Sequence, residues 1–554
     1  MRGHDEPREN LLGPFDVIVV GAGINGLGVA RDAAERGLRV ILLERDDLCS
    51  GVSAWSGRLV HGGLRYLEHR DFGLVRESLR ERELLFRLAP HLVKPKRLLM
   101  PTYSHNRRPA WLIRLGMIAY DVLSFDKRTG RHEKLSSKAT VARFPGISRE
   151  GLQGAVVFTD GQVEYAERLC AEVAIVAVAA GAVIRTKAVV EEPLLRDGRV
   201  IGVRFRDSRT GEMHAVEAPL TLNFAGPWID RVFRRGAPPQ PRLNGGTKGS
   251  HLIVDPFPGA PSDVVYYESR TDGRLVLVIP WMGRYLIGTT DKRFDDEPDD
   301  ARCDADEMEY LLGEVNALVP DARLTPEDVL FTYSGVRPLP YAPDVEEWEV
   351  PRTHILHDHA ADGLPGVVTA VGGKLTTYRQ LAEDAVDDAF TRLGRPIPPC
   401  KTAGMPLPGA KGDLIQIRAE LETRGLSPLS AERLVALYGA LATSVVDEAE
   451  GDPSLLAVLH EPTGALDVEL VYAVRREFAV TLSDVLARRI LLAFEPGHGL
   501  EVVDHSAHVL GSELGWDSER QRAEVSEYRQ WVSRLAVPSL AATGAGASAG
   551  DPVT

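Results

Sequence analysis

Cysteine is scarce in this sequence and does not cluster. Only four cysteines occur among 554 residues, at positions 49, 170, 303 and 400. No two of them form a Cys-x-x-Cys pair, which excludes the common structural zinc sites and dithiol redox pairs, and no metal site is predicted. Scattered, unpaired cysteines in a chain long enough to bury a full core are typical of a reducing compartment.

Long apolar runs are absent as well. No run of 18 or more apolar residues occurs, so no segment is expected to cross a bilayer as a helix. The first ten residues are charged and lack the apolar core of a secretory signal. We therefore expect a cytoplasmic protein, which leaves open that one of its surfaces lies on a membrane.

An excess of positive charge is also missing. Lysine and arginine total 65 against 79 aspartates and glutamates, which gives a net charge of −14. A general nucleic-acid binder needs a basic face for the phosphates, so this balance argues against nucleic acid as a partner. The apolar share of 44% and the charged share of 26% are those of an ordinary globular protein.

A dinucleotide-binding pattern lies near the start of the chain. A buried strand is predicted over residues 15–20, followed by Gly21-Ala-Gly23-Ile-Asn-Gly26, a helix over 24–36 and a second strand over 38–43. In a β-α-β unit, such glycines allow a tight turn, close approach of a pyrophosphate and close packing of the helix. Glu44 follows Gly26 by 18 residues, where a carboxylate accepts ribose hydroxyls and disfavours a 2′-phosphate. The pattern predicts a dinucleotide and leaves both NAD and FAD open.

The remaining chain alternates strand and helix patterns and then changes character. Between 145 and 160 it looks loop-like, and a long helix is predicted over 163–180. Further strands are predicted at 183–190, 199–207, 218–224 and 367–371. Five prolines between 395 and 408 predict a linker. Amphipathic helices then dominate, at 432–442, 468–479, 483–494 and 518–535.

Five further segments carry a resemblance to a known family. They are Arg58-Leu-Val-His-Gly-Gly-Leu-Arg-Tyr-Leu-Glu68, Lys248-Gly-Ser-His251, Ile279-Pro-Trp-Met282 with Ile287-Gly-Thr-Thr-Asp291, Thr332-Tyr-Ser-Gly-Val-Arg-Pro338, and Gly372-Gly-Lys-Leu-Thr-Thr-Tyr-Arg379. In this order they closely resemble the FAD-dependent, respiratory glycerol-3-phosphate dehydrogenases. The resemblance covers residues 15–395 strongly and continues more weakly into the C-terminal helices.

The resemblance implies an α/β fold of three parts. A Rossmann-like FAD-binding domain and a glycine-oxidase-like mixed-sheet substrate domain form the body, residues 15–394, and an all-helical C-terminal domain follows. The expected segments are 15–90, 150–235 and 335–394 for FAD, 91–149 and 236–334 for substrate, 395–408 for the linker, 409–536 for the helical domain and 537–554 for a disordered tail.

The resemblance also implies an activity. It implies FAD as cofactor, oxidation of sn-glycerol 3-phosphate to dihydroxyacetone phosphate, and delivery of electrons to a membrane quinone. An oxidase that releases hydrogen peroxide remains the alternative, because the motifs do not separate it from a dehydrogenase. A non-catalytic FAD-carrying protein is a third possibility, against which the retention of His61, Arg65, Arg337 and Lys374 argues. A homodimer is compatible with the sequence.

The substrate is a phosphate dianion with a secondary alcohol, so the site needs a phosphate clamp and a proton acceptor. Arg65, Arg337 and Arg352 match family arginines and suit phosphate oxygens, and Tyr66 adds a hydroxyl donor. His61 is the first candidate for the base, since an imidazole titrates near neutrality. Arg337 and Lys374 are candidates for holding the developing alkoxide or the reduced flavin, and Lys248 and His251 are second-rank candidates.

Cofactor contacts are expected along three glycine turns and one loop. Arg58 replaces a lysine of the family pattern in this loop, and Trp55 is an unexpected bulky residue there. The expected contacts are Gly21, Gly23, Asn25, Gly26, Glu44, Ser53, Arg58, Gly226, Gly372, Gly373, Lys374, Leu375 and Thr376.

Charge is distributed unevenly along the chain. Residues 84–120 contain no acid and seven basic residues, and they lead into an apolar stretch at 110–123 that is too short to span a bilayer. Either this stretch is a core helix, or it lies in a membrane surface as a peripheral contact through residues 84–123 on the inner face of the cell membrane. The acidic stretch 291–309 is expected to be a solvated loop and helix start.

Overall fold

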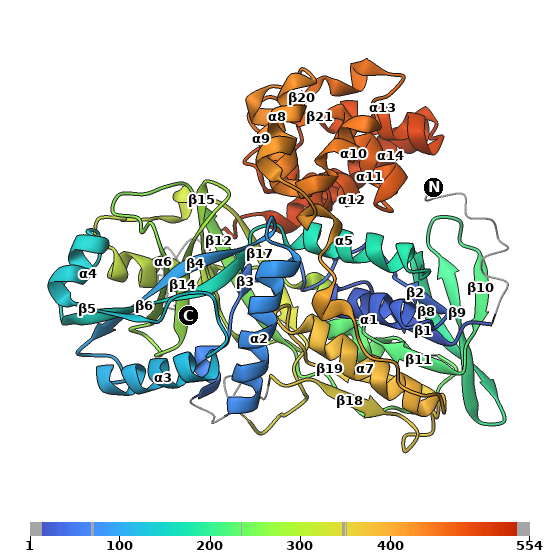
Figure 1. Cartoon of the computed structure of the whole chain (residues 1–554), viewed down its shortest axis with the longest axis horizontal. Coiled ribbons are helices and arrows are strands. Elements are labelled where there is room, and N and C mark those ends of the chain that lie inside the picture. The colour runs from blue at the N-terminus through green and yellow to red at the C-terminus, as the bar shows by residue number, and fades with distance from the viewer. Residues whose placement is uncertain (1–13, 68–70, 234, 346–349, 351, 540–554) are drawn as a thin grey trace, which may run out of the picture.

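The computed structural model describes residues 14–67, 71–233, 235–345, 350 and 352–539. Figure 1 shows two β-rich parts side by side and a helical domain, in orange and red, that covers one side of them. The predicted fold class is thereby confirmed. The predicted disordered tail lies outside the described residues from position 540 onward.

The first part is built on a six-stranded sheet with the order β18-β19-β11-β1-β2-β7. Its four strand pairs from β19 to β7 are parallel, and only β18 runs antiparallel at the edge. Every residue of β1 (Val17–Val20) and β2 (Val40–Leu43) is buried, as expected of a parallel sheet covered on both faces. The other strands are β7 (Val183–Arg185), β11 (Leu220–Asn223), β18 (Ile355–Asp358) and β19 (Val367–Val371).

Two layers cover this sheet. On one face α1 packs between two other helices, which the chain supplies from distant segments. On the other face a small antiparallel sheet packs its apolar side chains against Ile18 and Ile41. The helices are α1 (Ile24–Glu35), α5 (Ala166–Ala179) and α7 (Tyr378–Arg392), and the small sheet consists of β8 (Ala188–Arg196), β9 (Arg199–Asp207) and β10 (Met213–Glu217).

The second part is a large mixed sheet with the order β16-β12-β15-β14-β13-β4-β6-β3, to which β17 and β5 also pair. Four helices pack around it, and α6 begins with a capping box formed by Asp304 and Glu307. The strands are β3 (Leu59–Val60), β4 (Val93–Tyr103), β5 (Glu133–Ser136), β6 (Leu152–Val163), β12 (Thr247–Val254), β13 (Val264–Glu268), β14 (Leu275–Trp281), β15 (Arg284–Gly288), β16 (Lys292–Arg293) and β17 (Val329–Arg337). The helices are α2 (Phe72–Leu88), α3 (Ala110–Leu123), α4 (Ser137–Arg143) and α6 (Ala305–Leu318).

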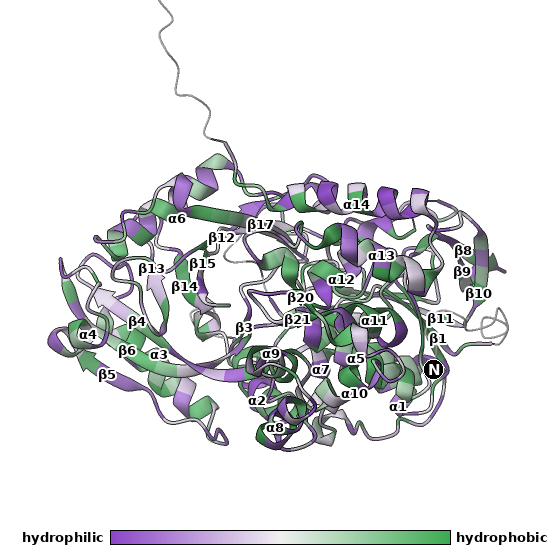
Figure 2. Ribbon diagram, turned by 90° about the horizontal axis from the view of Figure 1, so that it is seen from above, coloured by the Kyte–Doolittle hydropathy of each residue, from purple (hydrophilic) through white to green (hydrophobic). Residues whose placement is uncertain are grey.

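The C-terminal domain is a bundle of short helices with one small hairpin. Figure 2 shows its helix α14 as a largely hydrophilic element on the outside of the molecule. Residues Pro428–Asp447 are long and apolar enough to cross a membrane by length and composition, but half of this stretch is buried in the protein, as in a core helix. The elements are α8 (Leu414–Thr423), α9 (Pro428–Tyr438), α10 (Ala442–Asp447), β20 (Val458–His460), β21 (Ala465–Leu466), α11 (Asp467–Arg476), α12 (Leu482–Arg488), α13 (Val503–Leu514) and α14 (Ser518–Val532).

Three local predictions differ from the structure. The segment that looked loop-like between 145 and 160 contains most of β6, which pairs with β4 over eleven residue positions of the large sheet. The long helix predicted from 163 begins only at Ala166, because the strand continues to Val163. The predicted strand at 183–190 is two strands, β7 and the start of β8, and these belong to different sheets.

Candidate active site

One cavity of about 510 Å³ lies where the two sheets of the body meet. Its wall comes from the turn after β1, the loop after β2, the turn after β11, the end of β17 and the turn between β19 and α7. Apart from the end of β17, these are carboxyl ends of parallel strands, where α/β sheets place their ligands. The fold therefore brings five segments that are far apart in sequence to one cavity.

The turn after β1 is shaped by its glycines. Gly21 has a φ of +105°, and a Cβ on it would lie 2.6 Å from the carbonyl oxygen of Phe224. A Cβ on Gly26 would lie 2.0 Å from the carbonyl oxygen of Gly21, so this glycine lets α1 approach the strand. Gly23 is the N-cap of α1 and has no capping side chain, while the hydroxyl of Ser53 accepts from the next amide, Ile24, at 3.1 Å.

Glu44 lies at the end of β2 and lines the same cavity. Its carboxylate accepts from the backbone amides of Ala22 at 2.7 Å and Asp46 at 2.8 Å. Burial raises the pKa of Glu44, and these two amide donors act against that rise. The carboxylate thus joins the glycine turn to the following loop and keeps lone pairs for hydroxyl donors.

A second glycine turn lines the cavity next to the first, since a Cβ on Gly373 would lie 2.7 Å from the side-chain amide nitrogen of Asn25. Gly372 and Gly373 have φ values of +84° and +89°, and Gly226 has a φ of +58° with no atom near the position of a Cβ. Asn25 has a buried amide oxygen without a hydrogen-bond partner among the described residues. Lys374, Leu375 and Thr376 continue the wall. The bare backbone turns, two helix starts and the orphaned amide fit a bound FAD, so these are the residues that would hold it.

His61 lies beside the second glycine turn. Its amide donates to the hydroxyl of Thr376 at 3.2 Å, and its side chain lines the cavity. Burial lowers the pKa of His61 to about 4; Lys374 and Arg82 act in the same direction, while Asp160 opposes it. The imidazole is therefore neutral near pH 7 and able to accept a proton.

The loop that carries His61 is fixed by hydrogen bonds to side chains that lie outside the cavity. The amide of Gly62 donates to the hydroxyl of Tyr120 at 3.0 Å and to a carboxylate oxygen of Asp160 at 3.3 Å. The Tyr120 hydroxyl itself donates to Asp160 at 2.8 Å, and Arg82 forms an ion pair with the same carboxylate at 2.5 Å. Sequence reasoning missed Tyr120 and Asp160, because nothing local marks either residue as a partner of this loop.

Three cationic side chains line the cavity beyond His61. Arg337 donates to Asp291 at 3.0 Å and to the hydroxyl of Thr289 at 2.8 Å, and Arg352 lies 3.4 Å from the other oxygen of Asp291. The ammonium of Lys374 lies 4.0 Å over the ring of Tyr66 and donates to Ser78 at 3.1 Å. Burial lowers the pKa of Lys374, and Arg352 adds to the effect.

Asp291 corrects the prediction for the acidic stretch 291–309. This aspartate is only 8% exposed and lies against Arg337 rather than in a solvated loop. It ends the segment Ile287-Gly-Thr-Thr-Asp291, so the signal that could have identified it was the family segment rather than the local charge.

Three of the remaining candidates lie elsewhere or outside the described side chains, and a fourth lines the cavity. The side chain of Arg65 is not among those described. The guanidinium of Arg58 is turned away from the cavity into a buried ion pair with Glu167 at 2.5 Å, so this side chain does not supply the expected FAD contact. Lys248 pairs with Glu307 at 2.9 Å, whereas His251 lines the cavity, and burial lowers its pKa to about 3.

No metal site is predicted from the sequence, but one group of side chains in the structure could provide metal ligands. His357, His359 and Asp362 place possible ligand atoms within 4.8 Å of one another at the edge strand β18. His357 is bonded to Asp362 at 2.6 Å, and the two ring nitrogens of His359 are bonded to Gln240 and Thr369 at 2.8 Å each. The ring nitrogens of His359 therefore already have hydrogen-bond partners within the protein.

Comparison with known proteins covers both parts of the chain. Residues 16–379 match the family of FAD dependent oxidoreductases, and residues 400–521 match the C-terminal domain of alpha-glycerophosphate oxidase. A glycerol-3-phosphate dehydrogenase of Synechocystis sp. is 42% identical over 537 residues, which cover 95% of this chain and 97% of that protein.

Solved structures agree with these matches. The glycerol-3-phosphate dehydrogenase from Bacillus halodurans, complexed with FAD, aligns with a TM-score of 0.79 and 26% identity over 95% of this chain and 96% of that one. Glycine oxidase from Geobacillus kaustophilus aligns with a TM-score of 0.51 and 21% identity over 71% of this chain and 98% of its own, a likeness of fold alone.

Proposed function

Because this chain belongs to the family of FAD-dependent glycerol-3-phosphate dehydrogenases, we propose that it oxidises sn-glycerol 3-phosphate to dihydroxyacetone phosphate and passes the electrons to a membrane quinone. One observation carries the proposal. The cavity that bears the dinucleotide-binding turns also bears Arg337, Arg352 and Lys374, together with a neutral histidine. The cationic side chains can bind the phosphate group of the substrate, and the neutral histidine can accept the proton of its alcohol.

The phosphate end of the substrate is assigned to the guanidinium groups. Arg337 and Arg352 each present planar donors to the cavity, and both reach the carboxylate of Asp291. A phosphate dianion offers stronger acceptors than one carboxylate and can bind such donors bidentately. Arg65 stays a candidate for the same role from its place in the family segment. We place the phosphate against this wall and the secondary alcohol toward His61.

Proton removal is assigned to His61. FAD, when bound, supplies the acceptor for the hydride that leaves C2 of the substrate. His61 takes the hydroxyl proton, because its depressed pKa leaves the imidazole neutral at the pH of the cell. Lys374 holds the oxygen as negative charge develops on it, since its ammonium lies at the cavity wall next to Tyr66.

Quinone is the favoured acceptor over oxygen. The curated relative from Synechocystis sp. is named a dehydrogenase, while the matched C-terminal family is named after an oxidase. The exposed apolar face of α3 supports access to a lipid-soluble acceptor. Its side chains Trp111, Leu115, Ile118 and Val122 are 53–65% exposed, and Phe125 just beyond the helix is 78% exposed.

This face also supports the proposed location on the inner surface of the cell membrane. Ile113, Met117 and Tyr120 anchor α3 to the body, so the helix is held with its remaining apolar residues outward. Arg114 is exposed on the same helix and suits anionic lipid headgroups. Figure 1 shows α3 on the side of the body away from the C-terminal domain, where a flat surface can approach it.

The test is anaerobic mixing of the FAD-loaded enzyme with glycerol 3-phosphate. We expect the flavin absorbance to bleach within the turnover time, and glycerol, which lacks the phosphate, to bleach it far more slowly. Failure of glycerol 3-phosphate to bleach the flavin would contradict the proposed substrate. Reoxidation of the bleached enzyme by a short-chain quinone, compared with peroxide release under air, then decides between dehydrogenase and oxidase.

A further inference from the structure

The loop after β2 contacts both the cavity and the C-terminal domain. We call residues 44–58 the cofactor loop, since Glu44 and Ser53 line the cavity from it. Other side chains of the same loop contact the helical C-terminal domain. These include Trp55, which also lines the cavity, and Arg58, which does not; both depart from the family pattern. The contacts between this loop and the C-terminal domain therefore bear on the cofactor.

Asp47 makes the closest of these contacts. Its side chain is fully buried, and both carboxylate oxygens accept from α12 and the residue after it. Arg488 donates at 2.6 Å, and Arg489 donates to the two oxygens at 2.7 and 2.9 Å. Arg489 also donates to the carbonyl oxygen of Glu477, which fixes its fork within the C-terminal domain. The carboxylate of Asp47, which belongs to the cofactor loop, is thus buried between two arginines of the C-terminal domain.

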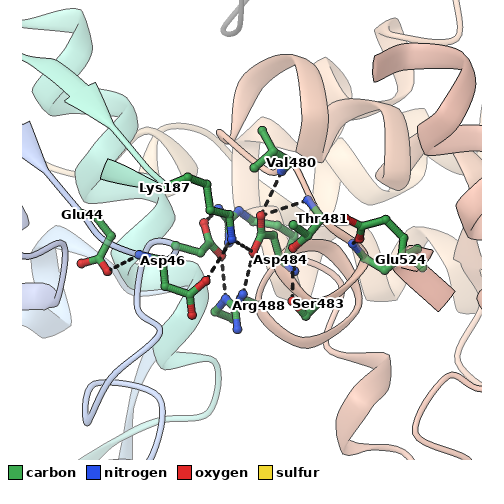
Figure 3. A network of polar contacts seen from close by, with 12 residues as sticks. Glu44, Asp46, Lys187, Val480, Thr481, Ser483, Asp484, Arg488 and Glu524 are labelled. Carbon is green, nitrogen blue, oxygen red and sulfur yellow. Dashed lines mark hydrogen bonds and ion pairs between the residues drawn. The ribbon is translucent and has the colours of Figure 1, made fainter. Parts of the chain in front are cut away.

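A second chain of charges runs beside the first. Figure 3 shows Lys187 between Asp46 of the loop and Asp484 of α12, at 2.9 and 3.1 Å, and Arg488 on the same Asp484 at 2.7 Å. The amide of Asp46 donates to Glu44 at 2.8 Å, so this chain ends on the carboxylate expected to bind the ribose. Although burial opposes it, Lys187 and Arg488 hold the pKa of Asp484 well below its usual range.

The far end of the loop meets aromatic side chains of the C-terminal domain. The ring of Trp55 lies 6.2 Å from that of Phe494 and 6.1 Å from that of Trp531, and the guanidinium of Arg534 lies 4.7 Å over it. The guanidinium of Arg58 lies 5.3 Å from the ring of Phe494. Trp55 and Arg58, two residues at which this loop departs from the family pattern, therefore both contact the C-terminal domain.

We propose that the C-terminal domain holds the cofactor loop in the conformation that binds FAD, with Asp47 as the positioning residue. Without these contacts the loop must be ordered when FAD binds, and the lost conformational entropy weakens binding. A loop fixed at Asp47 and at Trp55 presents Glu44 and Ser53 in place beforehand. This inference rests on FAD as the cofactor and is independent of the substrate and the electron acceptor.

The chain offers a matched control for Asp47. Arg168 of α5 and Glu477 form an equally buried ion pair between the body and the C-terminal domain, with both pairs of atoms at 2.6–2.7 Å. Neither of these two side chains contacts the cofactor loop in the hydrogen bonds and ion pairs described. Asp47→Asn and Glu477→Gln therefore remove one buried carboxylate charge each from the same domain interface, and only the first touches the loop.

The experiment measures FAD release from diluted holoenzyme and the melting temperature of each variant. We expect Asp47→Asn to release FAD at least about tenfold faster than the native protein, and Glu477→Gln to release it within about twofold of native at a similar loss of melting temperature. If both variants release FAD equally fast, or if Asp47→Asn releases it at the native rate, the contact only stabilises the fold and the proposal is wrong.

A milder variant covers the case in which Asp47→Asn does not fold. Arg489→Lys keeps the charge but loses the fork that reaches both oxygens of Asp47. We expect it to release FAD faster than Glu477→Gln does, and the reverse order would overturn the proposal. Glycerol 3-phosphate is absent from this test, so a wrong substrate assignment would leave its result unchanged.

Discussion

The carboxylate of Asp291 lies 3.0 Å from the guanidinium of Arg337. Its other oxygen lies 3.4 Å from the guanidinium of Arg352. One carboxylate thus lies against two cations at the cavity wall and uses donors that a phosphate group would need. Asp291 therefore both orients the arginines and competes with an anionic ligand for them.

This arrangement predicts opposite effects of Asp291→Asn on binding and on rate. Inorganic phosphate should bind roughly two- to fivefold more tightly, as expected when a partly exposed ion pair no longer competes. Flavin reduction by glycerol 3-phosphate should become slower, because Arg337 loses a partner that fixes its direction. Inhibition of anaerobic flavin bleaching by phosphate measures both. Glu309→Gln, an exposed acid on α6, is the control, and weaker phosphate binding by Asp291→Asn would contradict the competition.

Removal of one guanidinium should weaken substrate binding without loss of the cofactor. For Arg352→Met we expect the dissociation constant of glycerol 3-phosphate to rise about ten- to hundredfold, the range for lost hydrogen bonds to a charged group. The dependence of the bleaching rate on substrate concentration gives this constant. Arg302→Met, an exposed arginine, should behave like the native protein. An unchanged constant in Arg352→Met would move the phosphate to another wall of the cavity.

The depressed pKa of His61 predicts a particular pH profile. Because the imidazole is protonated only near pH 4, the rate of flavin reduction should not fall between pH 8 and 6 on account of this group. His61→Gln should lower that rate at every pH in this range and still retain FAD. Stopped-flow bleaching across the pH range is the measurement, and a native rate in His61→Gln would remove this residue from the mechanism.

The same shift has a consequence for stability. The pKa of His61 is lower in the folded protein than its ordinary 6.5, so the unfolded chain binds a proton first as the pH falls. His61 therefore lowers stability progressively between about pH 6.5 and 4, and above that range it has no such effect. We expect His61→Gln to lose less melting temperature than the native protein between pH 7 and 5. An equal loss in both proteins would mean that His61 titrates normally.

Much of the fold could be predicted because local signals and the final structure agree. The β-α-β unit is an example, since buried strands, glycines and Glu44 each indicate the same structure. Strand β6 could not be predicted, because Gly154, Asp160 and Gly161 look like turn residues. Asp160 is buried only because Arg82 and Tyr120 pair with it, and Gly161 fits because a Cβ there would lie 2.9 Å from the carbonyl oxygen of Val60. Those partners lie far away in sequence.

The candidate site likewise contains some residues that could be predicted from the sequence and others that could not. His61, Arg337 and the glycine turns could be found because they lie in continuous motifs, whereas Arg352 matches a family arginine in a more variable stretch. Asp291 could not be assigned from its acidic surroundings, since its partner Arg337 lies on β17, 46 positions later in the chain. Arg58 showed the opposite error: its segment suggested a cofactor contact, while the fold buries its charge against Glu167.

Membrane contact through α3 can be tested directly, by co-flotation of the protein with lipid vesicles. Trp111, Leu115 and Ile118 are 53–65% exposed on a helix whose inner stripe is already buried, so replacing them by serine should leave the fold and the cavity intact. We expect the triple variant to stop co-floating with vesicles of anionic lipid and to keep its rate of flavin reduction by glycerol 3-phosphate. Transfer of these side chains out of water is the main attraction to the bilayer, and Arg114 adds a charge contribution that salt weakens.

The control for this variant is another exposed apolar side chain far from α3. Ile415 on α8 is 81% exposed, so Ile415→Ser removes at least as much exposed apolar surface per residue from the C-terminal domain. It should float with vesicles as the native protein does. Equal flotation by the triple variant and the native protein would show that α3 is not the membrane contact. The exposed apolar face of α3 would then bind something other than a membrane. Flotation that is lost in both variants would show that the loss is not specific to α3 and would also contradict the proposal.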